Sequence, residues 1–137
     1  MDSHQKKYSR IPLIYIAGPY RNSDPVVKEQ NILTARQYGE EIIRLGAAAI
    51  VPHNNFRYYD GYAGEQFFLE ATLRLMSVCD AVLVIPGYIN SEGTKGEIVE
   101  ARHLGIPIYF NVSDISKFLG VWLEQFPEEY RNGNSKH

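Results

Sequence analysis

Short apolar runs alternate along the chain with longer segments in which apolar residues recur at helical spacing. The short runs are almost continuously apolar, which is typical of strands that are covered on both faces of a parallel sheet. The longer segments carry apolar residues on one side only, as amphipathic helices do. The expected strands are residues 11–17, 48–51, 81–85 and 107–111, and the expected helices are residues 25–45, 64–79, 94–104 and 113–127.

Residues that start and stop helices support these boundaries. Asp24 before Pro25 predicts a helix start, and Gly46 and Gly105 predict helix ends. Ser113 or Asp114 is expected to cap the last helix. The residues expected on the inner helix faces are Ile32, Ala35, Ile42 and Ile43, then Phe68, Ala71, Leu75 and Val78, and finally Ile115, Leu119, Trp122 and Phe126.

The alternation of strands and helices predicts an α/β fold. Short connections between them require a parallel sheet with helices on both faces. We therefore expect a single-domain, three-layer sandwich around a parallel sheet of four or five strands, Rossmann-like or flavodoxin-like. The domain should span residues 11–127, between a flexible segment 1–10 and a polar tail 128–137. A chain of 137 residues is long enough for one ordinary core.

Composition argues against several classes of function. The 14 basic and 16 acidic residues form no long run of one sign, so no nucleic acid polymer is expected as a partner. Cys79 is the single cysteine, and the metal, P-loop and dinucleotide motifs are missing, so we expect neither a metal nor a cofactor. The N-terminus is polar and no apolar run has the length of a membrane span. We expect a soluble, cytoplasmic protein without membrane contact.

Candidate ligand contacts lie where the strands end, because ligands of parallel sheets bind outside the carboxyl ends of the strands. Arg21 offers two parallel donors to a phosphate or carboxylate, or else forms a surface ion pair. His53 contacts a ligand or is a turn residue, and Asp80 orients a loop or contacts the ligand. The loop residues expected at this edge are Gly18, Pro19, Tyr20 and Arg21, then His53 and Asn54, then Gly87 through Gly93, and finally Asn111.

Residues 91–97 have the sequence Ser-Glu-Gly-Thr-Lys-Gly-Glu. They place the Glu97 carboxylate near the start of the helix that follows the third expected strand. Two interpretations are open. The helix N-terminus favours an ionised Glu97 for catalysis, and Ser91 and the backbone near Gly93 then form a cradle for an anion. Alternatively, Thr94 and Glu97 form a capping box that satisfies free backbone donors.

Four motifs in order carry a resemblance to a known family: Tyr15-Ile-Ala-Gly-Pro-Tyr-Arg21, Val51-Pro-His53, Cys79-Asp-Ala-Val82 and Ser91-x-Gly-x-x-x-Glu97. Their order resembles the nucleoside 2-deoxyribosyltransferase superfamily. That group includes the 2′-deoxynucleoside 5′-monophosphate N-hydrolases and small uncharacterised relatives. The resemblance spans about residues 11–110. The Glu97 segment also resembles part of the motif of cytokinin-activating phosphoribohydrolases, which cleave a similar bond.

The resemblance implies an enzyme that cleaves or transfers at the N-glycosidic bond of a (deoxy)nucleoside or nucleoside 5′-monophosphate. It places Glu97 as the nucleophile that attacks the anomeric carbon. Arg21 and Ser91 favour a monophosphate, which we expect to bind more tightly than its nucleoside. The residues expected to bind substrate are Tyr15, Gly18, Tyr20, Arg21, His53, Asp80, Ser91 and Gly93.

One position departs from the resembled pattern. The relatives have an aspartate on the helix before the third strand, which positions the nucleophile or protonates the departing base, and this chain has Thr72. Either Glu70, Glu100 or a partner subunit supplies that group, or the chain is a non-catalytic nucleotide-binding or regulatory module of the same fold. Cleavage of another N-glycoside such as NAD is a third alternative. Aromatic residues within 56–68 predict a homodimer or homotetramer with sites near the interface.

Overall fold

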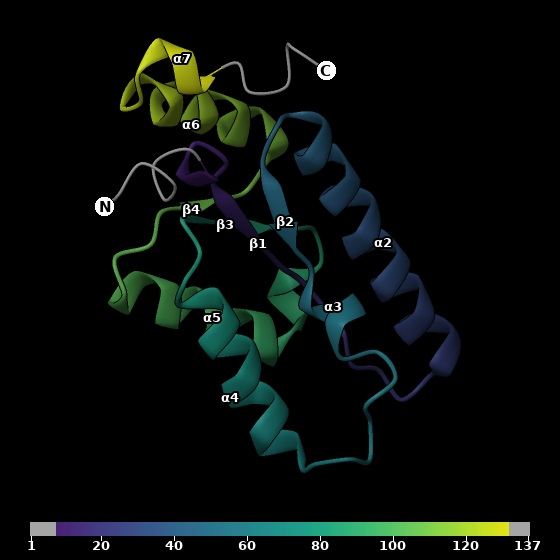
Figure 1. The fold of residues 1–137 in the computed structure, drawn as a ribbon. Helices are drawn as coiled ribbons and strands as arrows, with labels where there is room; N and C mark the ends of the chain where they lie inside the picture. The colour runs from purple at the N-terminus through teal and green to yellow at the C-terminus, as the bar shows by residue number, and fades with distance from the viewer. Residues whose placement is uncertain (1–7, 132–137) are drawn as a thin grey trace.

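A four-stranded sheet with the order β2-β1-β3-β4 lies at the centre of the computed structural model, which describes residues 8–131 (Figure 1). Every neighbouring pair of these strands is parallel. The strands are β1 (Leu13–Ala17), β2 (Ala48–Ile50), β3 (Ala81–Val84) and β4 (Ile108–Tyr109).

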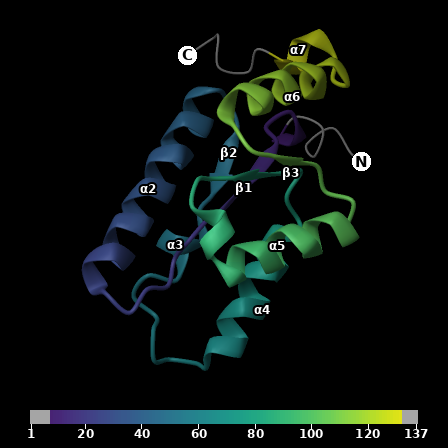
Figure 2. The same cartoon turned by 180° about the vertical axis from the view of Figure 1, so that it is seen from behind.

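Helices cover the sheet on both faces. In Figures 1 and 2, α2 and α6 lie on one side of the strands, whereas α4 and α5 lie on the other. This arrangement confirms the predicted three-layer α/β fold with a parallel sheet. The helices are α2 (Pro25–Arg44), α3 (Pro52–Asn55), α4 (Glu65–Met76), α5 (Glu92–His103), α6 (Val112–Glu124) and α7 (Glu128–Arg131), with a 3-10 turn, η1 (Tyr88–Asn90).

The core consists of two layers because successive residues of a strand point to opposite faces. Ile14 and Ile16 of β1 pack into the cluster that includes Ile115 of α6. Tyr15 and Ala17 pack into the other cluster, beside residues of α4 and α5. Strand β1 is therefore covered on both faces, as its continuously apolar sequence predicts.

Helix capping differs from the prediction at one of two sites. The Asp24 side chain accepts from the backbone N–H of Val26 at 2.9 Å and caps α2, as predicted. The cap of α6 is Asn111, whose side chain accepts from the N–H of Asp114 at 2.8 Å. The prediction of Ser113 or Asp114 as the cap is wrong because β4 is shorter, and α6 begins earlier, than the apolar pattern indicates.

Two residues predicted on inner helix faces are exposed. Ile43 lies one residue around α2 from the fully buried Ile42 and faces outward. Val78 is exposed because α4 ends at Met76, and Met76 is the residue that packs into the core. The apolar pattern gave the right side of each helix but not the width of the buried stripe.

Both termini lie partly outside the described residues. Residues 1–7 of the predicted flexible segment and residues 132–137 of the predicted tail are not described. Residues 128–131, also predicted as tail, form α7.

Strand order places a crevice at one end of the sheet. Strand β2 lies on one side of β1, and β3 lies on the other. The chain runs from β1 to β2 on one side and from β3 to β4 on the other, so the connections that leave β1 and β3 diverge. Open α/β sheets bind ligands at such a point.

Gly18, directly after β1, is a close-packed position at that point. A Cβ atom built there would overlap the side chain of Ile85, which is itself buried. We expect Gly18→Ala to lower the free energy of unfolding by roughly 1–3 kcal/mol, the usual range for overpacking. Urea denaturation measures the change.

Gly120→Ala is the matched control, because Gly120 lies within α6 and a Cβ atom there meets nothing within 4 Å. This change should raise the free energy of unfolding by about 0.5–1 kcal/mol, as expected for glycine inside a helix. Equal effects of the two substitutions would contradict the packing described for Gly18.

Candidate active site

A cavity of about 680 Å³ opens at the carboxyl ends of β1 and β3. Its lining comes from the loop after β1, from the first turns of α2, from α3 and the connection that follows it, from α4 as far as Thr72, and from the junction of η1 and α5. Sequence reasoning predicted the loop after β1, the segment after β2 and the start of α5, and the resemblance pointed to Thr72 of α4. It did not predict the contribution of α2. The predicted fourth loop is not part of the described lining, because Asn111 caps α6 instead.

A tyrosine and a glutamate form a buried pair against this cavity. Tyr15 of β1 is fully buried on the face that packs against α5, and its hydroxyl donates to Oε2 of Glu97. Glu97 lines the cavity although only 8% of its surface is exposed. Tyr15, predicted to bind substrate, is not in the described lining. It instead contacts the carboxyl group of Glu97, which does line the cavity.

The capping-box interpretation of Glu97 is wrong. Helix α5 begins at Glu92, and its cap is Ser91, whose Oγ accepts from the N–H of Thr94 at 3.2 Å. Glu97 therefore lies in the second turn, where its side chain accepts from Tyr15.

Burial controls the protonation of Glu97. Loss of hydration raises the pKa of Glu97 from 4.5 to about 7, and the hydrogen bond from Tyr15 opposes this rise. The helix N-terminus was expected to keep the carboxylate ionised, but that effect fades beyond the first turn. The pKa of Tyr15 is raised well above its usual value, first by burial and then by the charge of Glu97. The phenol therefore stays protonated and remains a donor.

Thr72 of α4 lies close to this pair. It lines the cavity, and hydrogen bonding with its side chain lowers the pKa of Tyr15, against the larger effect of burial. In this structure the single proton of the Thr72 hydroxyl is donated to the carbonyl oxygen of Leu69, at 2.8 Å. Glu70 and Glu100, the proposed substitutes for the missing aspartate, are not in the described lining.

His53 fastens the loop after β1. Its ring is buried, and Nε2 lies 3.0 Å from the carbonyl oxygens of both Gly18 and Pro19. Carbonyl oxygens only accept, so Nε2 carries the proton and Nδ1 is the acceptor of a neutral ring. Burial lowers the pKa of His53, which favours this neutral form. Gly18 and His53, both predicted to lie at the carboxyl ends of the strands, thus line the same cavity.

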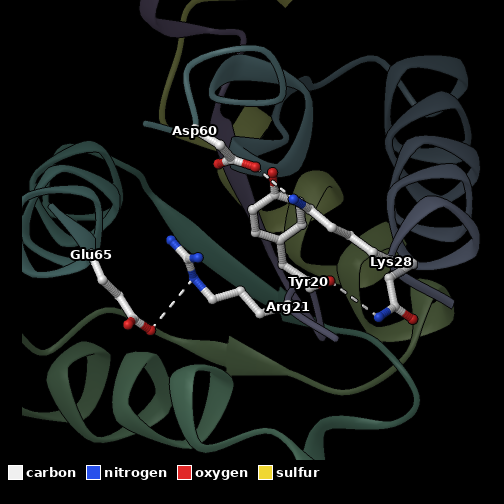
Figure 3. Close-up of polar contacts among 6 residues, drawn as sticks. Tyr20, Arg21, Lys28, Asp60 and Glu65 are labelled. Atoms are coloured by element: carbon white, nitrogen blue, oxygen red, sulfur yellow. Dashed lines mark hydrogen bonds and ion pairs between the residues drawn. The ribbon is translucent and has the colours of Figure 1, made fainter. Parts of the chain in front are cut away.

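Two cations flank the ring of Tyr20 at the cavity (Figure 3). The Lys28 ammonium lies 5.1 Å from the ring centroid, and the Arg21 guanidinium carbon lies 6.0 Å from it. Nζ of Lys28 is 2.5 Å from Oδ2 of Asp60, and Nε of Arg21 is 3.7 Å from Oε1 of Glu65. Arg21 therefore lines the cavity and forms the ion pair considered for it, whereas its binding of a phosphate or carboxylate ligand stays a prediction.

Sequence reasoning missed Lys28, Asp60 and Glu65. They belong to no recognisable motif, and Lys28 and Asp60 are 32 residues apart. The only available signal was charge near the ends of predicted elements, which many surface residues share.

Asp80 does not belong to this cavity. It precedes β3, so it lies at the amino end of the parallel strands, opposite the cavity. Its Oδ2 accepts from the N–H of Leu13 at 2.8 Å, which is the loop-orienting role considered for it. Ser91 and Gly93 do line the cavity at the start of α5.

Neither metal ligands nor a membrane span were found in residues 8–131. No group of three or more histidine, cysteine, aspartate or glutamate side chains in this range is placed to hold a metal ion. No helix of the described chain is both long and apolar enough to cross a membrane.

Comparison with known proteins gives one family and one fold. The family described as "Domain of unknown function (DUF7768)" matches residues 12–111. The structure is similar to that of a 2-deoxyribosyltransferase from the psychrotolerant bacterium Bacillus psychrosaccharolyticus, with a TM-score of 0.52 and 22% sequence identity. The similarity covers 70% of this chain and 69% of that one, and it shows a shared fold. No curated protein sequence matches the chain.

The raised pKa of Glu97 predicts a specific dependence of stability on pH. The folded protein binds this proton more tightly than the unfolded chain, so the contribution is complete below pH 4.5 and is lost as the pH rises through about 7. Glu97→Gln removes the titration and keeps an acceptor for Tyr15. From pH 4.5 to 8, the wild type should lose on the order of 3 kcal/mol relative to the variant, at about 1.4 kcal/mol per pKa unit.

Urea unfolding of both proteins at several pH values measures this difference. Parallel stability curves for the wild type and Glu97→Gln would show that Glu97 titrates normally in the folded protein.

Proposed function

We propose that this chain, which belongs to the family described as Domain of unknown function (DUF7768), cleaves or transfers at the N-glycosidic bond of a (deoxy)nucleoside or nucleoside 5′-monophosphate. The observation that carries the proposal is Glu97, a buried carboxyl group that lines a cavity at the diverging connections of the sheet. The motif set and the fold shared with a 2-deoxyribosyltransferase support it.

Glu97 is the nucleophile in this proposal. Its Oε2 accepts from Tyr15, which holds the carboxyl group and leaves the other oxygen free of that bond. The ionised oxygen attacks the anomeric carbon, the C–N bond breaks, and its electron pair leaves with the base. Water or a second base then attacks the glycosyl ester and restores the carboxylate.

The departing base needs a proton or a hydrogen bond. Thr72 is placed beside Tyr15 and lines the cavity, but a hydroxyl group is a hydrogen-bond donor and too weak an acid to deliver a full proton near pH 7. The proton then comes from water, or the base leaves hydrogen-bonded but not protonated. This same observation favours a second candidate, a non-catalytic nucleotide-binding or regulatory module.

Base release from a panel of substrates tests the proposal. The panel holds deoxynucleosides, ribonucleosides, their 5′-monophosphates and NAD, and chromatography detects the free base. We expect release by the wild type and a loss on the order of 10³-fold or more with Glu97→Ala, because the nucleophile is removed. Glu100→Gln is the matched control, since Glu100 is on the same helix but outside the described lining.

Each outcome separates the candidates. Equal release by the wild type and Glu97→Ala would refute the role of Glu97. Binding without turnover across the panel would identify the regulatory module, and release of nicotinamide alone would identify an enzyme acting on NAD.

The assembly proposed for the chain is a homodimer or homotetramer with the cavity near the interface. Tyr58, Tyr59 and Tyr62, between α3 and α4, and Phe67 of α4 are exposed although large and apolar. Asp60 within the same connection lines the cavity, so a partner on this surface lies next to the site.

Light scattering tests the assembly. We expect a mass above that of one chain at micromolar concentration, and a shift towards the monomer for Tyr58→Ser with Tyr62→Ser, because the exposed aromatic area is lost. A wild-type monomer under these conditions would contradict the proposed assembly.

A further inference from the structure

The charge of the cavity lining is predominantly negative. Among the described residues that line the cavity, four carry carboxyl groups and one carries a guanidinium group. His53 adds no charge because burial favours its neutral form. The four acidic residues are Asp60, Glu65, Glu92 and Glu97, and the basic residue is Arg21.

The cations near the cavity are already bound by its carboxylates. Figure 3 shows two of these pairs on either side of Tyr20. The ion pairs are Arg21 with Glu65 at 3.7 Å, Lys28 with Asp60 at 2.5 Å, and Lys95 with Glu92 at 3.4 Å.

We propose that Asp60 and Glu65 determine specificity by selecting a nucleoside without a 5′-phosphate over the corresponding 5′-monophosphate. This inference rests on the proposed function and names its substrate class. A phosphate that binds Arg21 and Lys28 must compete with Glu65 and Asp60 for these cations, and both carboxylates lie beside it as negative charges. An uncharged nucleoside leaves both ion pairs in place.

The start of α5 adds a carboxylate of its own to the lining. Ser91 Oγ accepts from both the N–H and the hydroxyl of Thr94, at 3.2 and 2.8 Å. Glu92 lies in the first turn, where its charge complements the helix dipole and opposes a second anion. This proposal replaces the expectation that Arg21 and Ser91 favour a monophosphate, because the sequence did not reveal the ion pair between Arg21 and Glu65.

Solvent limits the size of the effect. The side chains of Arg21 and Glu65 are 50% and 77% exposed, so water and salt screen their attraction. Lys28 and Asp60 are closer together and less exposed. We therefore expect a preference of several-fold to tens-fold that depends on salt, and no absolute exclusion of phosphate.

Calorimetric binding to Glu97→Gln protein tests the proposal, because this background stops turnover. The probes are a deoxynucleoside, its 5′-monophosphate and inorganic phosphate. The test variant adds Asp60→Asn and Glu65→Gln together. The matched control adds Glu40→Gln, which removes a carboxylate paired with Arg36 at 3.5 Å on α2, outside the described lining.

We expect the parent to bind the nucleoside more tightly than the monophosphate. The double variant should bind the monophosphate and inorganic phosphate about 10-fold more tightly at low salt, with nucleoside affinity nearly unchanged, and about 0.5 M salt should shrink the gain. The control should resemble the parent. Glu65→Gln alone should shift affinities in the same direction, which keeps the test valid if the double variant folds poorly.

A parent that prefers the monophosphate, or a double variant whose phosphate affinity is unchanged or weaker, would overturn the inference. Inorganic phosphate binding needs no nucleoside recognition, and base release by the wild type is measured separately. Failure of the charge-based selection is therefore distinguishable from failure of the proposed glycosidic function.

Discussion

The hydrogen bond from Tyr15 to Glu97 is the interaction on which the rest of the site depends. It joins the inner strand β1 to α5 across 82 residues of sequence and holds a carboxyl group at the wall of the cavity. Burial alone would keep that group neutral, and the phenol partly restores its ionised form. The resulting pKa of about 7 keeps the charged form accessible near neutral pH. A carboxylate that is less hydrated than usual is also a better nucleophile.

Charge arrangement separates the inner and outer parts of the cavity. At the inner end, Glu97 is shielded from water and contacts an uncharged donor. At the outer end, Asp60 and Glu65 are partly exposed and paired with cations. The inner carboxyl group is therefore governed by desolvation and the outer ones by ion pairing and salt. The two regions respond to different changes in solution conditions, so their contributions are experimentally separable.

Sequence patterns predicted the strands that are buried on both faces, and they predicted the segment with Glu97 that follows β3. The apolar runs at β1 and β3 report burial directly, and the glutamate after β3 was placed correctly at the cavity. The pattern could not identify Asn111 as a cap. The Asn111 cap depends on where β4 ends, which neighbouring segments decide. The pattern did place Asp80 directly before the third strand, and therefore at the opposite end of the sheet, but the resemblance assigned Asp80 to the site. The pairing of Lys28 with Asp60 was also out of reach, because it arises only when α2 and a distant loop pack together.

Tyr15 and Glu97 come from opposite halves of the chain, and the connection between α3 and α4 lies between them. Neither half contains the complete pair. If the backbone were cut in that exposed connection, each fragment would carry one member, and the contact would re-form only when the fragments reassociated. The raised pKa of Glu97 depends on the burial of this contact, so its return would report that β1 had packed correctly against α5.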